Sequence, residues 1–185
     1  MHLTRCPGWR KLKMHKKNTM PWLSILLMTM LVGCGYRFTG SGTFPDGANH
    51  VFVELLENQT SESGIESTVT ENLVNEFTLR EKEIFVGDIN EADSILSGAV
   101  SRISFQTISA KGKDSARERR VTVWVSLKLS DRDGRVLWAA KDLSDNEAYR
   151  GVDDKNETER NKRVAIGRAS RRIAERALNR LTDEF

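Results

Sequence analysis

The chain has 185 residues, of which 38% are apolar and 30% are charged. This length suits a single domain, and this composition allows a buried core and excludes wholesale disorder. The first 33 residues carry six basic side chains and no acid, whereas residues 34–185 carry 23 basic and 26 acidic side chains. The net charge of the larger part is therefore negative, which excludes a nucleic-acid-binding function argued from charge.

The N-terminal segment predicts a secretory signal. Basic residues between Arg5 and Lys17 precede an uncharged run with an apolar centre at residues 22–32. This run is shorter than the roughly 20 residues that a membrane-spanning helix needs. Residues 1–33 are therefore predicted to be a signal peptide. The start codon stays open between Met1, Met14 and Met20, and a start at Met14 gives a more compact signal.

The end of the apolar run, Leu31-Val32-Gly33-Cys34, resembles a lipobox, the processing site of bacterial lipoproteins. The resemblance implies that the Cys34 thiol receives a diacylglycerol, that the chain is cut before Cys34, and that the new amine is acylated. Several acyl chains anchor a protein firmly, because a single chain binds only reversibly. Residue 35 is glycine rather than aspartate, which by the same resemblance favours the outer membrane. The alternative is a buried cysteine that ends a membrane anchor.

Residues 34–185 contain few side chains suited to catalysis. Their only cysteine is Cys34 and their only histidine is His50. An intramolecular disulfide and a Cys/His zinc site are therefore excluded, and we expect no cofactor, no metal and no enzymatic activity. His50 precedes a strand-like run, far from any nucleophile motif, so a structural role is more typical of it than catalysis.

Residues 34–50 are rich in glycine and are predicted to be a lipidated tether, and residues 51–185 are predicted to be a single domain. His50–Leu55 predicts a short strand. Ser63-Gly64-Ile65-Glu66 fits a capping box, in which Ser63 accepts a hydrogen bond from the Glu66 amide. An amphipathic helix is expected to follow, because apolar residues recur at a spacing of four. These residues are Ile65, Val69, Leu73 and Phe77.

Two further strands are expected before the centre of the chain, a brief one at Ile84–Val86 and a longer one at Ala92–Phe105. Gly98 is expected to weaken the longer strand or to mark a bulge. The side chains predicted to share one side of it are Ile95, Ala99, Ile103 and Phe105. Residues Gln106–Arg120 are predicted to be a polar connection.

Residues 121–130 show the clearest alternation in the sequence, which predicts a strand with one apolar face. The apolar members are Val121, Val123, Val125, Leu127 and Leu129. Asp131-Arg132-Asp133-Gly134 predicts a hairpin turn in which Gly134 has positive φ. The returning strand begins at Val136–Lys141 and is expected to extend as far as Tyr149.

A long helix is predicted from Glu157 to Thr182. Its inner face is expected to consist of Ile166, Ala169, Ile173, Ala174, Ala177, Leu178 and Leu181. Eight basic residues between Arg160 and Arg180 cover the rest of the helix, and a solvated face is favoured over a binding site.

These elements predict an α+β fold with two helices packed on one face of a mostly antiparallel four- to five-stranded sheet. The opposite face carries Thr122, Trp124 and Ser126, and it either meets solvent or meets a partner.

In this order the elements resemble the LptE family of lipopolysaccharide-assembly lipoproteins. The residues that carry the resemblance are Cys34-Gly35-Tyr36-Arg37-Phe38, a short strand that runs into Glu57-Asn58, the capped helix, Gly134-Arg135-Val136-Leu137-Trp138 and the basic terminal helix. The resemblance implies a non-enzymatic outer-membrane lipoprotein at the periplasmic face. Such a protein sits inside the LptD barrel as a plug, assists assembly of that barrel, and binds lipopolysaccharide.

Basic side chains on a connection can reach the phosphates of lipopolysaccharide. The candidate contacts are therefore Lys111, Lys113, Arg117, Arg119 and Arg120. The competing interpretation is a solvated loop that Asp114 and Glu118 partly neutralise.

Two other classes of function stay open from the sequence. One is an outer-membrane lipoprotein that scaffolds or activates a cell-wall enzyme, although such a protein usually has a longer tether than residues 35–50. The other is an exported hydrolase that uses only aspartate and glutamate, although no spacing in the sequence singles out a pair.

Overall fold

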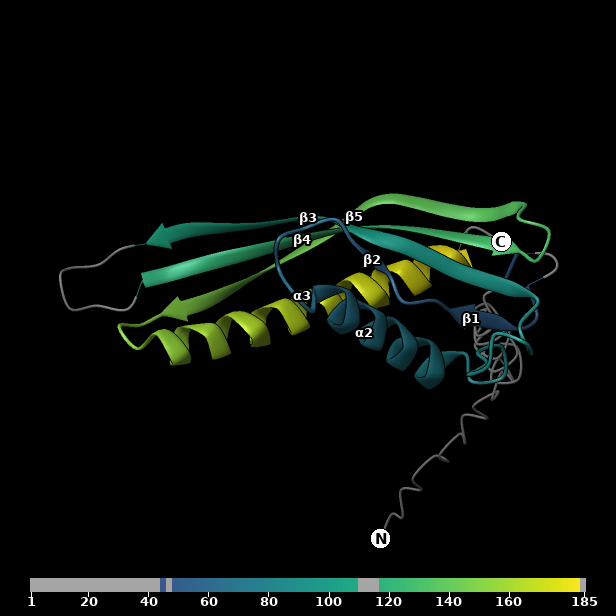
Figure 1. The fold of residues 1–185 in the computed structure, drawn as a ribbon, viewed down its shortest axis with the longest axis horizontal. Helices are drawn as coiled ribbons and strands as arrows, with labels where there is room; N and C mark the ends of the chain where they lie inside the picture. The colour runs from purple at the N-terminus through teal and green to yellow at the C-terminus, as the bar shows by residue number, and fades with distance from the viewer. Residues whose placement is uncertain (1–43, 46–47, 110–116, 184–185) are drawn as a thin grey trace, which may run out of the picture. The chain divides into compact units, whose positions relative to one another are not determined.

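The computed structural model describes residues 44–45, 48–109 and 117–183. A sheet lies above a layer of two helices (Figure 1). In chain order the elements are β1 (Val51–Val53), β2 (Glu57–Asn58), α2 (Ile65–Arg80), β3 (Ser94–Ser109), β4 (Arg117–Asp131), β5 (Val136–Gly151) and α3 (Lys155–Asp183).

The sheet has the order β1-β3-β4-β5, and β2 pairs with β3 beside β1. Strands β3, β4 and β5 form an antiparallel meander, whereas β1 and β2 run parallel to β3. The predicted α+β fold is thus confirmed, with five strands and a mostly antiparallel sheet. We call the end of β3 at Ser94 the proximal end of the sheet and the end at Ser109 the distal end.

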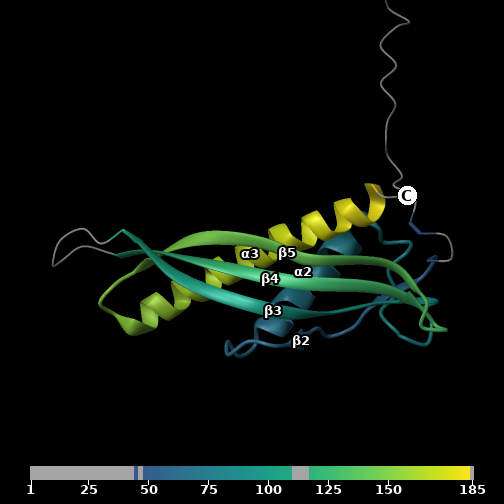
Figure 2. The same cartoon turned by 90° about the horizontal axis from the view of Figure 1, so that it is seen from above.

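Strand β4 supplies the centre of the core. Its five alternating apolar side chains, from Val121 to Leu129, are each at most 3% exposed. Both helices lie on the same face of the sheet (Figure 2), as their apolar sides require. The predicted buried residues of both helices are confirmed: Ile65, Val69, Leu73, Phe77, Ile166, Ala169, Ile173, Ala174, Ala177, Leu178 and Leu181.

The predicted capping box at the start of α2 is wrong. Gly64 is the N-cap residue with φ 80°, and no side chain caps the helix. Glu66 instead accepts a hydrogen bond from the Asn58 side-chain amide at 2.7 Å. The carboxylate therefore ties the helix to the end of β2, and glycine supplies the left-handed conformation at which the chain enters the helix.

The predicted buried side of β3 is also wrong in its first half. Leu96 and Val100 are buried there, whereas Ile95 and Ala99 are only half-buried. A register shift between Val100 and Arg102 then turns the strand over, so that Ile103 packs against the core. A bulge inserts one residue and reverses the alternation, which a fixed period of two cannot represent.

Gly98 lies in β3 directly beside the backbone of β4. A Cβ atom at this position would lie 2.2 Å from the Ser126 carbonyl oxygen and 2.9 Å from a methyl group of Leu127. The glycine therefore allows close contact between two backbones, which is one of the two roles that glycine has inside strands.

The strands are longer than the sequence predicted. Strand β3 continues to Ser109 and β4 begins at Arg117, so both ends of the predicted polar connection 106–120 are strand. Ile84–Val86 forms only an isolated bridge, between Phe85 and Val51. The predicted hairpin turn is confirmed, with Gly134 at φ 83°.

The chain just before β1 is fastened to the domain. The ring of Phe44 is buried and lies 6.3 Å from that of Phe77. The carboxylate of Asp93 accepts the backbone N–H groups of Asn49 and His50 at 3.0–3.2 Å. Partial burial alone raises the pKa of Asp93, but the hydrogen bonds from His50, Ser94 and Asn49 outweigh it and lower that pKa below its ordinary value.

The two helices cover different lengths of the sheet. Helix α2 has 16 residues and α3 has 29, which correspond to about 24 Å and about 43 Å. Helix α2 packs on β1, β2, β3 and α3 and lies beneath the proximal half of the sheet (Figure 1). Of the elements that the structure describes, only the first turns of α3 therefore cover the distal half.

Replacing Leu73 by alanine should lower the free energy of unfolding by about 2–5 kcal/mol, because it opens a cavity in the core. Leu73 is 0% exposed. The matched control is Leu79→Ala on the same helix, where the side chain is 77% exposed and the change should stay within about 0.5 kcal/mol. Urea unfolding measures both, and equal midpoints for the two variants would contradict the assigned helix face.

Candidate functional site

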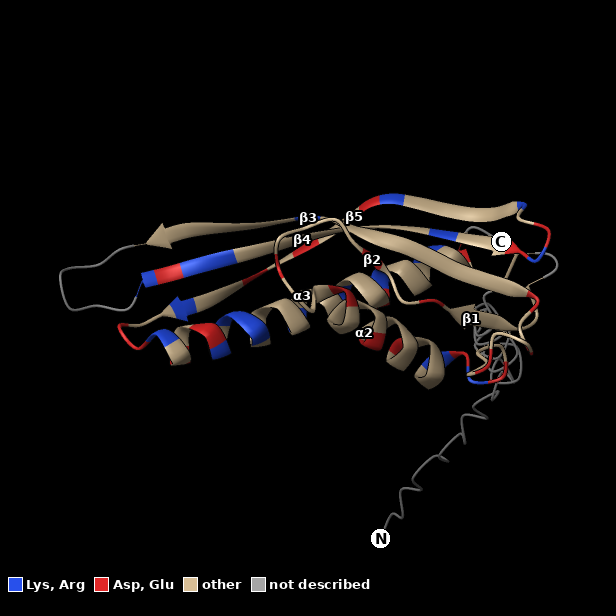
Figure 3. Cartoon of the chain, viewed as in Figure 1, with Lys and Arg blue, Asp and Glu red and all other residues tan. Residues whose placement is uncertain are grey.

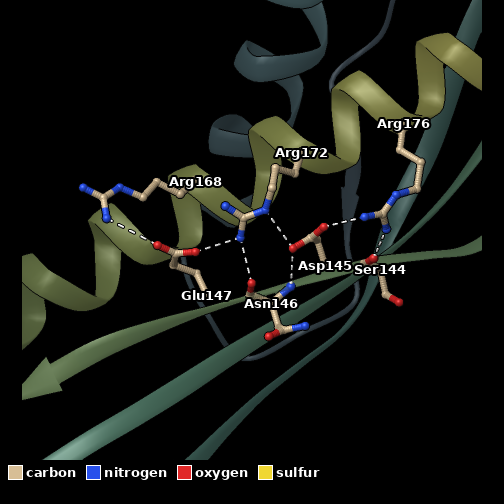
Figure 4. A network of polar contacts seen from close by, with 7 residues as sticks. All are labelled: Ser144, Asp145, Asn146, Glu147, Arg168, Arg172 and Arg176. Atoms are coloured by element: carbon tan, nitrogen blue, oxygen red, sulfur yellow. Dashed lines mark hydrogen bonds and ion pairs between the residues drawn. The ribbon is translucent and has the colours of Figure 1, made fainter.

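The site begins with three arginines of α3 that reach across to β5 (Figure 4). Arg172 donates to Asp145 at 2.9 Å and to Glu147 at 2.8 Å. Arg176 pairs with the other oxygen of Asp145 at 2.6 Å, and Arg168 pairs with Glu147 at 3.3 Å. The five side chains thus form one alternating row of charges between the helix and the edge strand.

The acids of this row lie on the helix side of β5. Their side chains are 11% exposed at Asp145 and 22% exposed at Glu147. Partial burial alone raises the pKa of Asp145, but hydrogen bonds from Arg172 and from the Asn146 amide outweigh it, so this pKa lies below its ordinary value. The predicted solvated face of α3 is confirmed for Arg168 and Arg176, whose side chains are 65% and 45% exposed, and Arg172 is partly exposed at 38%. The same three side chains also join the helix to the sheet.

Distal to this row, a hollow of about 750 Å³ lies beside the end of β5 and the first turns of α3. Its apolar lining includes Tyr149 and Val164, and its charged lining consists of two arginines, Arg150 and Arg168, and two glutamates, Glu118 and Glu157. The remaining lining residues are Ser109, Ala148, Asn161 and Ala165. A ligand with an apolar part and an anionic group fits this lining where the anionic group meets the arginines and stays away from the two carboxylates.

The predicted basic segment is divided by the structure. Three of its arginines, Arg117, Arg119 and Arg120, lie in the first four residues of β4. Lys111 and Lys113 lie outside the described residues. Successive strand residues face opposite sides, so Arg117 and Arg119 share the helix side while Arg120 lies on the open face. Arg119 packs over Gly151, and its Nε atom is buried without a hydrogen-bond partner among the described residues.

Three further cations were not singled out from the sequence, two of them at this end and one, Arg102, near the middle of the sheet. Arg102 stacks on the ring of Trp124, with its guanidinium carbon 4.0 Å from the ring centroid. Arg150 and Arg168 line the hollow. Figure 3 shows the basic segments at the start of β4 and along the first half of α3. Strand pairing and the packing of α3 on β5 bring Arg150 and Arg168 to the distal end, although they lie far from Arg117 in the sequence.

His50 lies away from this region. Its Nδ1 atom is 3.6 Å from Asp93, and its side chain is half exposed. Among residues 44–45, 48–109 and 117–183, no group of three or more His, Cys, Asp or Glu side chains is placed to hold a metal ion. None of the helices in the described ranges is long and apolar enough to span a membrane.

This arrangement defines a class, a small α+β domain whose helices cover one face of a meander sheet. The fold is similar to that of lipoprotein B from Nitrosomonas europaea, with a TM-score of 0.52 and 10% identity over 80% of this chain and 90% of that one. Rare lipoprotein B from Shewanella oneidensis gives a TM-score of 0.46 and 13% identity over 72% of this chain and 95% of that one. No curated protein matches the sequence.

The family model of LptE, described as lipopolysaccharide-assembly, matches residues 48–181. Since this range includes every helix and strand of the domain up to the last turn of α3, the chain belongs to the LptE family. The resemblance seen in the sequence is thereby confirmed at the level of the family.

Replacing Asp145 by asparagine should lower the free energy of unfolding at pH 7 by about 1–2 kcal/mol, since it weakens charged hydrogen bonds to partly exposed arginines. The folded-state pKa is lowered, so the stabilisation is present above about pH 4 and is lost as the pH falls through the folded-state pKa. Urea midpoints at pH 7 and pH 2 measure this. Asp153→Asn, at an exposed position, is the control, and a cost that persists at pH 2 would exclude the charge as its cause.

Proposed function

We propose that this chain is an outer-membrane lipoprotein that occupies the lumen of an LptD-type β-barrel, assists the assembly of that barrel, and contacts lipopolysaccharide. The observation that carries the proposal is the family match across residues 48–181. No covalent chemistry is part of this function. The proposal takes Cys34 as the lipidated residue and residues 1–33 as the signal, with the anchor at the periplasmic face of the outer membrane.

The surface of the domain supports this role. The lumen of a large barrel is polar, and a plug must therefore present charged and polar groups around most of its circumference. Most charged side chains of α2 and α3 are exposed or partly exposed. Glu76 is buried and paired with Arg80, and Lys162 lies over Phe105. Arginine pairs such as Arg172–Asp145 hold the long helix in place without adding an apolar surface.

The distal end supports the contact with lipopolysaccharide. This lipid combines phosphates with acyl chains, and guanidinium groups bind phosphate with several parallel hydrogen bonds. The hollow places Arg168 and Arg150 beside Tyr149 and Val164, and it also contains Glu118 and Glu157, which balance the charge of the two arginines. Arg117 and Arg120 lie at the same end and are exposed, so they belong to the proposed contact together with Lys111 and Lys113. Arg119 is kept as a candidate, although its packing against Gly151 gives it a structural role as well.

Depletion of this protein should reduce the amount of correctly folded barrel and sensitise cells to large apolar antibiotics, because the barrel loses its plug during assembly. Heat-modifiable mobility of the barrel in a gel and antibiotic susceptibility measure the two effects. Wild-type protein should restore both, whereas Cys34→Ala should not, since it has no site for the anchor. Normal barrel folding and an intact permeability barrier after depletion would overturn the plug function.

Reversing two charges at the distal end, by Arg117→Glu with Arg120→Glu, should weaken lipopolysaccharide binding about five- to tenfold at 0.15 M salt, or roughly 1–1.4 kcal/mol. The difference should shrink toward 1 M salt, where screening acts over about 3 Å. The matched control is Lys128→Glu with Lys141→Glu, which changes the same charge at exposed positions nearer the proximal end. Equal binding by both double variants would remove the distal cations from the contact.

A further inference from the structure

The two edges of the sheet are treated differently by the fold. At the edge formed by β5, side chains of α3 bond the outward carbonyls of the strand. Arg172 donates to the carbonyl oxygen of Asn146 at 2.7 Å, Asn161 donates to that of Arg150 at 3.0 Å, and Arg176 donates to that of Ser144. These acceptors cannot pair with another strand, so the helix protects this edge.

The opposite edge is filled only in its proximal half. Strand β1 pairs with Ser94–Leu96 and β2 pairs with Ala99–Val100. The last bond on this side joins the Gln59 amide to the Val100 carbonyl at 3.0 Å. Strand β3 then continues to Ser109 with β4 on its other side only, as far as the described residues extend (Figure 2).

The register shows which backbone groups of β3 face outward. The backbone carbonyl of Ser144 accepts a hydrogen bond from α3, so Ser144 does not bond to β4. Trp124 is the residue of β4 opposite Ser144. The backbone groups of Trp124 therefore point away from β5 and toward β3. Trp124 pairs with Arg102, which therefore bonds to β4. The same alternation makes Ser104 and Gln106 bond to β4 as well. The residues between the bonded rows direct both N–H and C=O away from the sheet, and they are Ile103, Phe105 and Thr107.

No hydrogen bond from any described residue reaches these outward groups, so β3 offers three N–H donors and three carbonyl acceptors in a row. The segment is rich in β-branched and aromatic residues and has a single charge at Arg102. Phe105 is 42% exposed, although its ring lies on the helix side of the sheet, opposite Val121. A long uncharged edge of this kind is a template for strand addition.

The side chains flanking the edge specify the strand that would fit. On the helix side, the Lys162 Nζ atom lies 5.4 Å from the centroid of the Phe105 ring, which is still 42% exposed, and Ile103 packs against the core beside it. On the open face, Arg102 is exposed above Trp124. An added strand therefore needs apolar residues facing Phe105 and an acidic residue facing Arg102, in the alternation that a strand provides.

We propose that the free edge of β3, residues 102–108, binds an extended segment of the barrel partner by strand addition. This inference rests on the proposed function, because that function supplies the partner. A second copy of the chain fits less well. Antiparallel pairing centred on Phe105 satisfies the backbone, but it places Ile108 opposite Arg102 and brings no carboxylate to it.

The test uses the full chain, co-expressed with its barrel and purified in mild detergent. Phe105→Pro removes an outward N–H and leaves the bonds to β4 in place, and edge strands tolerate proline at such positions. Phe105→Val is the matched control, because it removes the ring and keeps the N–H. Phe105→Pro should reduce the co-purified barrel at least tenfold, and Phe105→Val at most about twofold. An unchanged urea midpoint shows that the proline variant is folded.

Amide hydrogen exchange gives a second measurement on the wild-type chain. The amides of Ile103, Phe105 and Thr107 should exchange quickly in the protein alone and slowly in the complex. The amides of Arg102, Ser104 and Gln106 should be slow in both, because they bond to β4, and they serve as internal controls.

The remaining outcomes overturn the inference in distinguishable ways. If the proline variant recovers as much barrel as wild type, the edge is not the contact and the proposed function stands. If wild type recovers no barrel, both fall. If the outward amides are already slow in the protein alone, the edge is occupied without the barrel. Loss of that protection on dilution would then identify a second copy, and its persistence would identify another segment of this chain.

Discussion

The apolar face of β4 is the constraint on which the rest of the structure depends. Five side chains from Val121 to Leu129 are nearly inaccessible to water, and they stay so only if something covers the whole row. One short helix cannot do this, because α2 has 16 residues and extends about 24 Å, roughly half the length of a fifteen-residue strand such as β4. The longer α3 completes the cover, and its charged contacts with β5 set where it lies.

Much of this fold follows from local pattern. The period of two in β4 and the spacing of four in α2 each place apolar residues on one side, and nothing in the surroundings overrides them. The errors occur where local pattern is interrupted. In β3 a bulge changes which side is buried, and at Gly64 backbone conformation replaces the side-chain cap expected from Ser63 and Glu66. Both depend on neighbouring strands that a single segment does not reveal.

The candidate site was predictable only in part, for a related reason. Cations near Arg117 are visible in the sequence as a cluster, but Arg150 and Arg168 join them only through strand pairing and the return of α3. The sequence also gives no sign that Asp145 and Glu147 face a helix. Acidic side chains near the end of a strand are usually exposed to solvent. The structure shows that the acids of β5 and the arginines of α3 form ion pairs, with N–O distances of 2.6–3.3 Å.

The unequal reach of the two helices has a consequence for motion. Local opening of a protein costs less where fewer apolar contacts are broken. The proximal half of the sheet has both helices beneath it, whereas the distal half has α3 alone among the described residues. There α3 is held by buried apolar residues such as Ile166 and Ala169 and by partly exposed arginines. Separation of the distal strands from α3 should therefore cost less free energy than opening of the proximal core. The domain would then behave as a stable base carrying a looser arm, and the arm is the part that holds the hollow, the distal cations and the free edge of β3.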